Sequence, residues 1–230
     1  MTNKNKMKPV LLDLLSDIRN SWLRTITLYS SKIIKISSEK SLVFNFAWLF
    51  MEDKNYPKYH IDFEKEVVNS EFGKFFDLYF EFKHYMKSIY SKQKIRLTPL
   101  RVAFEFKFLI NNGGTTNQHK GRLNVFKDIK ELSDQINKDK IDIGVFFLLT
   151  NEKAYTKKGN KSKSKKYLVH DQQDYPKGSY LPGKPSENKI KAPCRIKFKW
   201  KTVNKDHYYI SPIIITKDWY SKKYNFLIHK

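Results

Sequence analysis

The sequence of 230 residues predicts a mixed α/β fold, in which an antiparallel meander and one central strand form a β-sheet flanked by α-helices. Three short segments, at 58–67, 75–82 and 102–108, alternate apolar and polar residues with the period of a half-buried strand. The segment at 142–150, DIGVFFLLT, is almost wholly apolar and of strand length, which is typical of a strand covered on both faces. In other segments, apolar residues recur at the three- and four-residue spacing of amphipathic helices.

Two helices are predicted before the first strand. Apolar residues at helical spacing recur from residue 9 to about residue 28, and Pro9 suits a first helical position. A second helix begins near Ser37 or Ser38, because either hydroxyl could cap it, and it continues to about residue 53. The predicted sheet is therefore preceded by two helices.

The strands at 58–67, 75–82 and 102–108 follow one another without a predicted helix between them. A turn around Gly73 separates the first two, and a polar, basic connection leads to the third. We therefore expect an antiparallel meander. The segment NVFKDIKELSDQI at 124–136 then predicts a helix, because its apolar residues form one stripe, and the strand at 142–150 completes the core.

After residue 151 the character of the chain changes. Lysines dominate the segment 157–166, and turn-forming residues follow without periodicity, so the region 152–193 is expected to be a mobile, basic surface loop. In 194–201 apolar residues alternate with basic ones, which predicts a strand with one wholly basic face at the start of a strand-like extension, 194–230. We expect a single domain over residues 1–230, with its core at about 36–155.

The charge of the chain favours a polyanionic partner. There are 45 Lys and Arg against 23 Asp and Glu, a formal net charge of +22. Codon bias in an AT-rich genome would enrich lysine, but it would also enrich glutamate, so the excess of basic residues favours nucleic acid or an anionic surface as the partner. The side chains expected to contact phosphate are those of Lys157, Lys158, Lys161, Lys163, Lys165, Lys166, Arg195, Lys197 and Lys199.

Other features of the sequence narrow the class of protein. No apolar run reaches the length of a membrane span, and the N-terminal segment lacks a small-residue cleavage site, so we expect neither a membrane partner nor secretion. Cys194 is the single cysteine and is expected to be a buried side chain in a reducing compartment, which indicates a cytoplasmic protein. The histidines lack zinc-ligand spacing, and no glycine-rich loop has phosphate-binding spacing.

Acidic side chains on two predicted strands suggest metal-dependent phosphodiester chemistry. Glu105 and Lys107 leave the same face of their strand roughly 6–7 Å apart, and Asp77 lies on the preceding strand. Because adjacent strands are roughly 4.8 Å apart, Asp77 and Glu105 can reach a common ion, whereas Glu81 lies about 13 Å along the strand from Asp77. Glu64, on the first strand, could offer a third carboxylate or a ligand to a second metal ion if the register allows.

Structural explanations compete with this interpretation. Glu105 and Lys107 could form an ordinary ion pair, or the acidic face of the sheet could simply be solvated. A Glu-x-Lys pattern alone is weak evidence, since Glu81 begins a second one on the preceding strand. Asp128 and Asp134 are expected on the polar side of their helix, exposed to solvent.

The pattern resembles the PD-(D/E)XK nuclease superfamily, the restriction-endonuclease-like proteins, over about residues 36–155. Asp77 takes the place of the first acid of the motif, and Glu105-Phe106-Lys107 matches its second part. The order of elements also agrees, with an upstream helix that bears an acid, Glu39, before the meander, the helix and the central strand. The sequence departs from the family pattern at Phe76, where a proline often precedes the acid.

The resemblance implies a restriction-endonuclease-like fold and a Mg²⁺-dependent endonuclease of restriction or defence type that cuts double-stranded DNA. Asp77, Glu105 and the Phe106 carbonyl would hold Mg²⁺, or Mn²⁺ in its place, while Lys107 would orient or activate the attacking water. Glu39 would act in the outer shell, unless it is only a first-turn acid. Two copies of the chain could pair to cut both strands. The alternative is a non-catalytic nucleic-acid-binding protein with a basic surface on the same fold.

Overall fold

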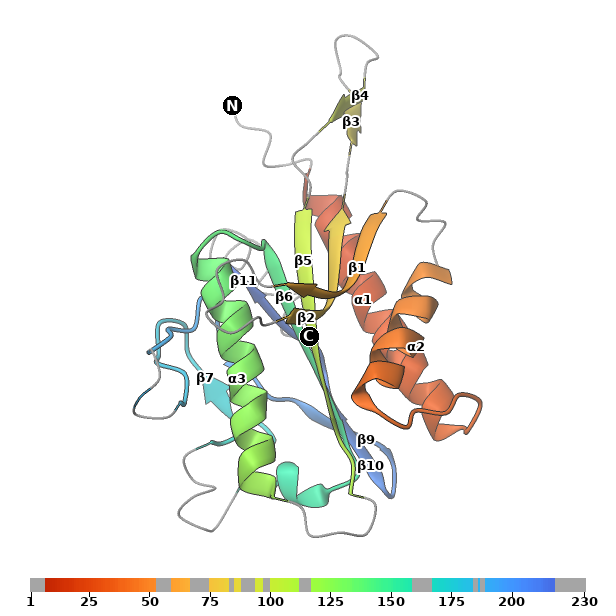
Figure 1. Cartoon of the computed structure of the whole chain (residues 1–230), viewed down its shortest axis with the longest axis vertical. Helices are drawn as coiled ribbons and strands as arrows, with labels where there is room; N and C mark the ends of the chain where they lie inside the picture. The colour runs from red at the N-terminus through yellow and green to blue at the C-terminus, as the bar shows by residue number, and fades with distance from the viewer. Residues whose placement is uncertain are drawn as a thin grey trace.

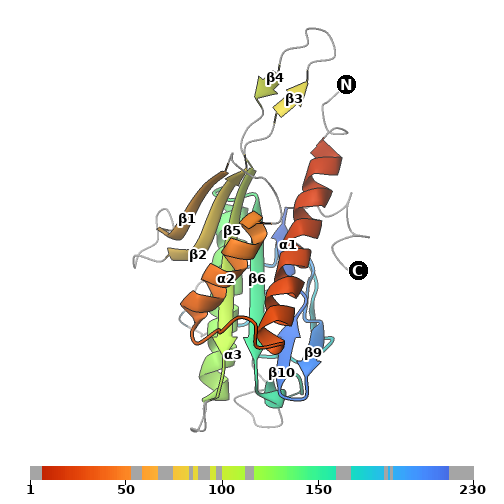
Figure 2. The ribbon, with the colours of Figure 1, turned by 90° about the vertical axis from the view of Figure 1, so that its right-hand side faces the viewer.

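The chain forms three layers, with one mixed β-sheet between helices (Figures 1 and 2). In the computed structural model, α1 (Met7–Ser30) and α2 (Glu39–Glu52) cover one face of the sheet, and α3 (Gln118–Asn137) covers the other. The predicted mixed α/β class is therefore confirmed. The residues that the structure describes are 7–52, 59–66, 75–82, 85–87, 94–96, 100–111, 117–158, 167–183, 186 and 189–217.

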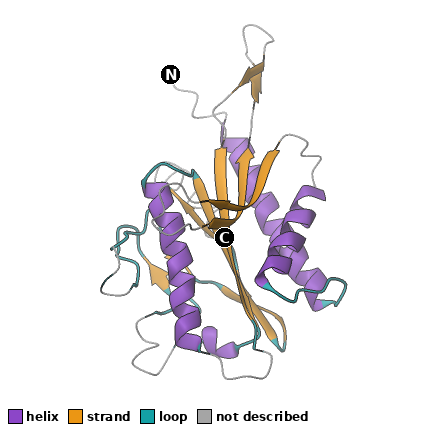
Figure 3. Cartoon of the chain, viewed as in Figure 1, coloured by secondary structure: helices purple, strands orange, loops and turns teal. Residues whose placement is uncertain are grey.

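The main sheet, drawn in orange in Figure 3, contains both antiparallel and parallel pairs. Its strands are β1 (Tyr59–Glu66), β2 (Phe75–Phe82), β5 (Leu100–Leu109), β6 (Ile143–Thr150), β9 (Trp200–Asn204), β10 (His207–Ile210) and β11 (Ile213–Thr216), in the order β1-β2-β5-β6-β10-β9, with β11 also on β6. The pairs β1–β2 and β2–β5 are antiparallel, so the predicted meander is confirmed. The crossover through α3 places β6 parallel to β5. A separate two-stranded sheet, β3 (Tyr85–Lys87) and β4 (Lys94–Arg96), lies in the connection between β2 and β5.

Short side chains cap the helices next to the sheet. At the start of α2, the Ser38 hydroxyl accepts a hydrogen bond from the Ser41 amide at 3.1 Å, and the Ser41 hydroxyl accepts one from the Ser38 amide at 3.0 Å. The reciprocal cap satisfies amides that have no partner within the helix and confirms Ser38 as the predicted capping residue. Asn117 caps α3 by accepting from the Lys120 amide, so this helix begins six residues before the predicted segment at 124–136.

Aromatic side chains fill the core between the sheet and the first two helices. Phe46 of α2 packs against Phe106 and Phe147 at ring-centroid distances of 5.3 and 4.9 Å, and Trp22 of α1 lies 4.7 Å from Phe147. The indole of Trp22 also donates a hydrogen bond to the Ile210 carbonyl at 3.0 Å. A second apolar cluster, which includes residues of α3, fills the other side of the sheet. Each residue of β6 is buried, as expected for a strand covered on both faces.

The segment 194–201 differs from its prediction, because it is two short strands rather than one. β8 (Ile196–Lys197) pairs with β7 (Asp174–Tyr175), and the chain then enters β9, which pairs with β10. The predicted alternation of burial nevertheless holds, since Cys194, Ile196 and Phe198 are buried. Cys194 is a buried side chain as expected, and burial raises the pKa of its thiol to about 11.

The region 152–193 was expected to be a mobile surface loop, and its described part contradicts that expectation. It contains a 3₁₀ turn at Lys153–Tyr155 and the strand β7. Tyr155, Tyr167, Val169 and Leu181 are buried in the cluster beside α3. These apolar residues lack regular spacing, so periodicity could not indicate that they pack on the core.

In the described part of the chain, no helix is both long and apolar enough to cross a bilayer.

We expect Phe147→Ala to lower the free energy of unfolding by about 3–5 kcal/mol, because Phe147 is fully buried among aromatic rings. Phe44→Ala is the matched control, since Phe44 is 58% exposed and its loss should cost no more than about 0.5 kcal/mol. Equilibrium unfolding in urea measures both changes. Equal effects of the two substitutions would contradict the packing described for this face of the sheet.

Candidate active site

The strands β2 and β5 separate near the middle of the sheet. Their pairing runs from Phe82 opposite Leu100 to Leu78 opposite Phe104 and ends there. β5 continues to pair with β6 on its other side as far as Leu109. We call the gap between β2 and β5 beyond the last pair the fork. The next residues on the two strands are Asp77 and Glu105, so both predicted acids stand where the fork opens.

Carboxylates replace the missing strand along the open edge of β5. The amide of Phe106 donates a hydrogen bond to Asp77 Oδ2 at 2.7 Å, and the amide of Phe108 donates to Glu39 Oε2 at 3.1 Å. A buried amide without an acceptor would cost about 1–3 kcal/mol, so these contacts compensate for the loss of pairing with β2. The same contacts fix the orientations of both carboxylates. Glu39, the first residue of α2, thereby reaches the Glu-x-Lys motif from the helix layer.

Asp77 and Glu105 converge at the fork and share a hydrogen bond. Glu105 is 6% exposed, and its burial, reinforced by the charges of Asp128 and Asp77, raises its pKa well above the ordinary value. Burial also raises the pKa of Asp77, although the hydrogen bond from the Phe106 amide opposes that shift. In the metal-free protein Glu105 therefore keeps its proton to a higher pH than an exposed glutamate does, and its O–H group donates a hydrogen bond to Asp77. The two carboxyl groups are close enough to bind one ion.

Lys107 lies beside this pair, but it forms its ion pairs with other acids. Its Nζ is 3.0 Å from Glu39 Oε1 and 2.8 Å from Asp128 Oδ2, and it donates to the Phe106 carbonyl at 3.1 Å. Burial alone would lower the pKa of Lys107, but Asp128 and Glu39 outweigh burial and raise it. Lys107 is therefore a fixed ammonium group. It can donate hydrogen bonds to a water or a phosphate oxygen, but it is poorly suited to accept a proton from water.

Asp128 was expected to be solvated, and the structure corrects that expectation. Its side chain is only 19% exposed and contacts Lys107 from α3. Burial raises the pKa of Asp128 to about 7, and the charges of Asp77 and Glu39 add to the effect while Lys107 opposes it. Helical spacing could have predicted this burial, because residue 128 lies three positions after Val125 and four before Leu132, on the apolar stripe of the helix. Asp134, by contrast, is partly exposed and pairs with Lys138.

Glu64 does not join the carboxyl pair, contrary to the prediction that it could be a metal ligand. The register of β1 and β2 places it opposite Asp77, as that prediction required. Its backbone, however, has φ of 53°, in the left-handed region that breaks the regular alternation of a strand. Its carboxylate lies 2.7 Å from Lys40 Nζ, and its side chain is 61% exposed. An exposed ion pair at a distorted strand position therefore replaces the expected inward-facing ligand.

The predicted phosphate-binding residues that the structure describes fall into three groups. Lys157 and Lys158 are exposed after the 3₁₀ turn at 153–155. Arg195 is paired with Asp174, to which its Nε donates at 2.8 Å, so its charge is largely compensated. Lys197 and Lys199 line a cleft beside α1. The remaining predicted residues, Lys161, Lys163, Lys165 and Lys166, lie outside the described residues.

The donors at the fork fit a hard divalent cation. Among the described residues, no group of three or more His, Cys, Asp or Glu side chains is arranged to hold a metal ion. Mg²⁺, however, commonly takes only one or two protein carboxylates and completes its coordination with water and substrate phosphate. Asp77 and Glu105 supply two carboxylates in mutual contact, and the Phe106 carbonyl is directed toward Lys107 at the same fork. Mn²⁺ prefers the same oxygen donors.

Comparisons with known proteins do not identify a relative. The scan against protein-family models finds no match. The searches of curated proteins and of solved structures find none either. The chemistry attributed to the fork therefore rests on its own contacts and charges.

We expect Glu105→Gln to stabilise the metal-free protein at about pH 8. The raised pKa means that folded Glu105 holds its proton more tightly than the unfolded chain does. Its contribution to stability is thus complete below the ordinary pKa of 4.5 and is lost as the pH rises through the raised value. Glutamine cannot ionise and can still donate to Asp77, so the gain should shrink as the pH falls toward that ordinary value.

Urea unfolding in EDTA at several pH values measures this difference, and Glu81→Gln, in the second Glu-x-Lys pattern, is the control. The control should not reproduce the pH-dependent gain, because Glu81 lies away from the fork. A loss of stability in Glu105→Gln at about pH 8 would instead indicate an ordinary ion pair and would contradict the described electrostatics.

Proposed function

We propose that this chain is a divalent-metal-dependent endonuclease of the PD-(D/E)XK type that hydrolyses phosphodiester bonds in DNA. The convergence of Asp77 and Glu105 at the end of their paired strands, with Lys107 beside them, carries the proposal. The order of elements supports it, because an antiparallel meander is followed by a crossover helix and a parallel strand. We accordingly propose a restriction-endonuclease-like core for the mixed sheet. The charge of +22 supports a nucleic-acid substrate.

The residues at the fork have distinct roles in this proposal. Asp77, Glu105 and the Phe106 carbonyl would hold Mg²⁺ or Mn²⁺. The bound cation supplies positive charge that neutralises the scissile phosphate and lowers the pKa of a coordinated water. Asp77 is oriented for binding by the Phe106 amide, whereas Glu105 must first lose its proton. Both acids come from the sheet, which fixes their positions better than a loop would.

Lys107 would act as a hydrogen-bond donor rather than as a base. Its ammonium group can orient the attacking water or stabilise negative charge on a non-bridging phosphate oxygen. Glu39 and Asp128 are positioning residues, because they hold the ammonium group from the helix layers on the two sides of the sheet. The expected outer-shell role of Glu39 thus takes the form of a contact with Lys107.

A non-catalytic nucleic-acid-binding protein is the second candidate. The strong positive charge supports it, since charge alone accounts for binding without cleavage. In the simplest version of this second candidate, Glu105 and Lys107 form an ordinary ion pair with each other. The ion pairs of Lys107 with Glu39 and Asp128 favour the enzyme over that form.

Metal binding should release protons, and its affinity should rise with pH above the ordinary carboxyl pKa of 4.5. The reason is that the raised pKa of Glu105 makes the proton a competitor of the cation. Isothermal titration with Mn²⁺, in two buffers of different ionisation enthalpy, measures the number of protons released. Glu105→Gln should bind the ion more weakly and release fewer protons, while Glu81→Gln should behave as the wild type. An affinity independent of pH would contradict the proposed coordination by Glu105.

Cleavage of supercoiled plasmid should require Mg²⁺ or Mn²⁺ and should stop in EDTA. Asp77→Asn, Glu105→Gln and Lys107→Met should each lower the cleavage rate by about 100-fold or more, because each removes a metal ligand or the adjacent positive charge. Glu81→Gln is the matched control and should cut normally, and circular dichroism shows whether each variant folds. Wild-type protein that binds DNA but never cuts it with either metal ion would support the binding protein instead.

A further inference from the structure

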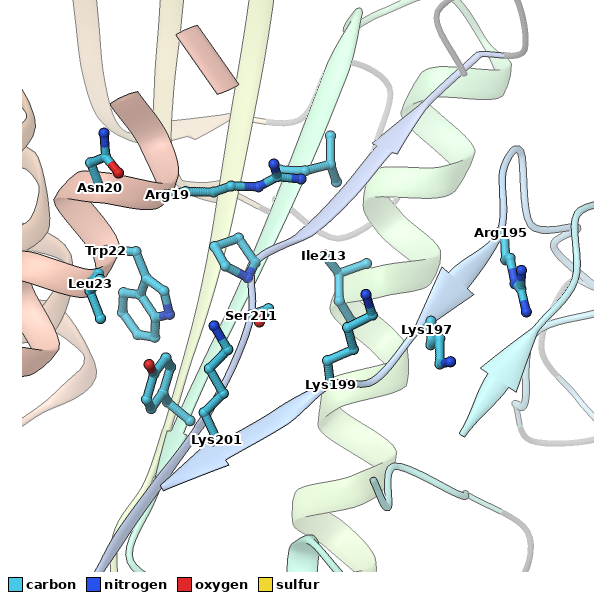
Figure 4. A pocket seen from close by; sticks show the side chains of 13 residues that line it. Arg19, Asn20, Trp22, Leu23, Arg195, Lys197, Lys199, Lys201, Ser211 and Ile213 are labelled. Atoms are coloured by element: carbon cyan, nitrogen blue, oxygen red, sulfur yellow. The ribbon is translucent and has the colours of Figure 1, made fainter. Parts of the chain in front are cut away.

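A cleft lies between α1 and the extended segment 195–201 (Figure 4). Its volume is about 150 Å³. The apolar side chains of Trp22 and Ile214 contribute to its lining. We call it the basic cleft, after the side chains of Arg19, Lys197, Lys199 and Lys201 that line it.

Apolar and basic residues alternate along the segment 195–201, and this alternation creates a row of lysines. Because Ile196 and Phe198 are buried in the cluster that includes α3, the intervening side chains point to the other side. Lys197, Lys199 and Lys201 therefore line the cleft at intervals of roughly 6–7 Å, as expected for every second residue of an extended chain. Arg19 approaches the row from α1 (Figure 4).

The cleft concentrates positive charge without acidic residues in its wall. None of the described residues that line it is Asp or Glu. Burial lowers the pKa of Lys199, and the neighbouring charges of Lys197, Arg19 and Lys201 lower it further. An anion in the cleft would relieve this repulsion. A linear row of cations suits a linear polyanion better than a single small anion.

The basic cleft and the fork lie at different positions across the sheet. Glu105 and Lys107 share their strand face with Ala103, which packs in the cluster beside α3. The cleft opens beside α1, and β6 and β11 lie between it and β5 in the sheet. None of Asp77, Glu105 and Lys107 lines the cleft, so a phosphate bound in the cleft is not the one that would be cut at the fork.

We propose that the basic cleft binds the sugar–phosphate backbone of one nucleic-acid strand, at a site separate from the fork. Arg19 and Lys201, which sequence patterns did not connect, act together with Lys197 and Lys199. Arg195 contributes less, because Asp174 already compensates its charge. The proposal does not depend on cleavage, since binding to the cleft requires neither the carboxylates of the fork nor a metal ion.

Salt dependence of binding in EDTA tests the proposal. Fluorescence anisotropy follows a labelled single-stranded oligonucleotide as the salt concentration rises from about 50 to 200 mM. The cleft variant combines Lys197→Gln, Lys199→Gln and Lys201→Gln. The control combines Lys35→Gln, Lys140→Gln and Lys205→Gln, which are exposed lysines elsewhere, so both variants lose the same net charge. Thermal unfolding checks that both are folded.

The slope of log affinity against log salt should become shallower by about 0.7 for each phosphate that the protein no longer neutralises, or about 2 in the cleft variant. The control should keep a slope close to that of the wild type. Arg19→Gln changes the opposite wall and should reduce the slope by about 0.7. Equal slopes in the cleft variant and the control, or no strand binding by the wild type, would overturn the proposal. Because the assay is run in EDTA, it measures strand binding alone, so a failure of cleavage stays distinguishable from a failure of the cleft.

Discussion

The open edge of β5 is the constraint on which the candidate site depends. β5 is paired with β6 along most of its length, but β2 pairs with it only through residues 78–82, so the amides of Phe106 and Phe108 on the open edge need other acceptors. Asp77 and Glu39 provide them. The demand for backbone hydrogen bonds thus brings acids from a strand and from a helix to one place. Glu105 and Lys107 lie at the same place, because they follow Phe104, the last residue of β5 that pairs with β2.

The electrostatics of the fork oppose stability in the metal-free protein. Burial raises the pKa values of Asp77, Glu105 and Asp128. These acids and Glu39 surround one ammonium group, that of Lys107. Side chains selected only for stability would not gather several carboxyl groups in a buried place. Such costs are common where function requires a strained arrangement of charges, and a divalent cation would relieve them. The basic cleft presents the opposite problem at a separate place in the fold, where cations lie close together and an anion would relieve their repulsion.

Much of the fold could be predicted from short-range patterns. Alternation predicted the strands of the meander, and strand spacing alone indicated that Asp77 and Glu105 could meet. The left-handed backbone of Glu64 could not be predicted, because nothing in a period of two indicates where a strand will be distorted. The break between β8 and β9 and the packing of 152–193 depend on contacts between distant segments, which periodicity does not encode. Asp128 was predictable, because its helical spacing places it on the buried stripe.

The central claim is that the fork binds a divalent cation through carboxylates of two strands. Anomalous diffraction from crystals soaked in Mn²⁺ at about pH 8, where Glu105 loses its proton more readily, tests it most directly. We expect a single strong peak between the carboxylates of Asp77 and Glu105, within coordination distance of the Phe106 carbonyl. A fork that stays empty at saturating Mn²⁺, with Lys107 and Glu105 in direct contact, would contradict the account.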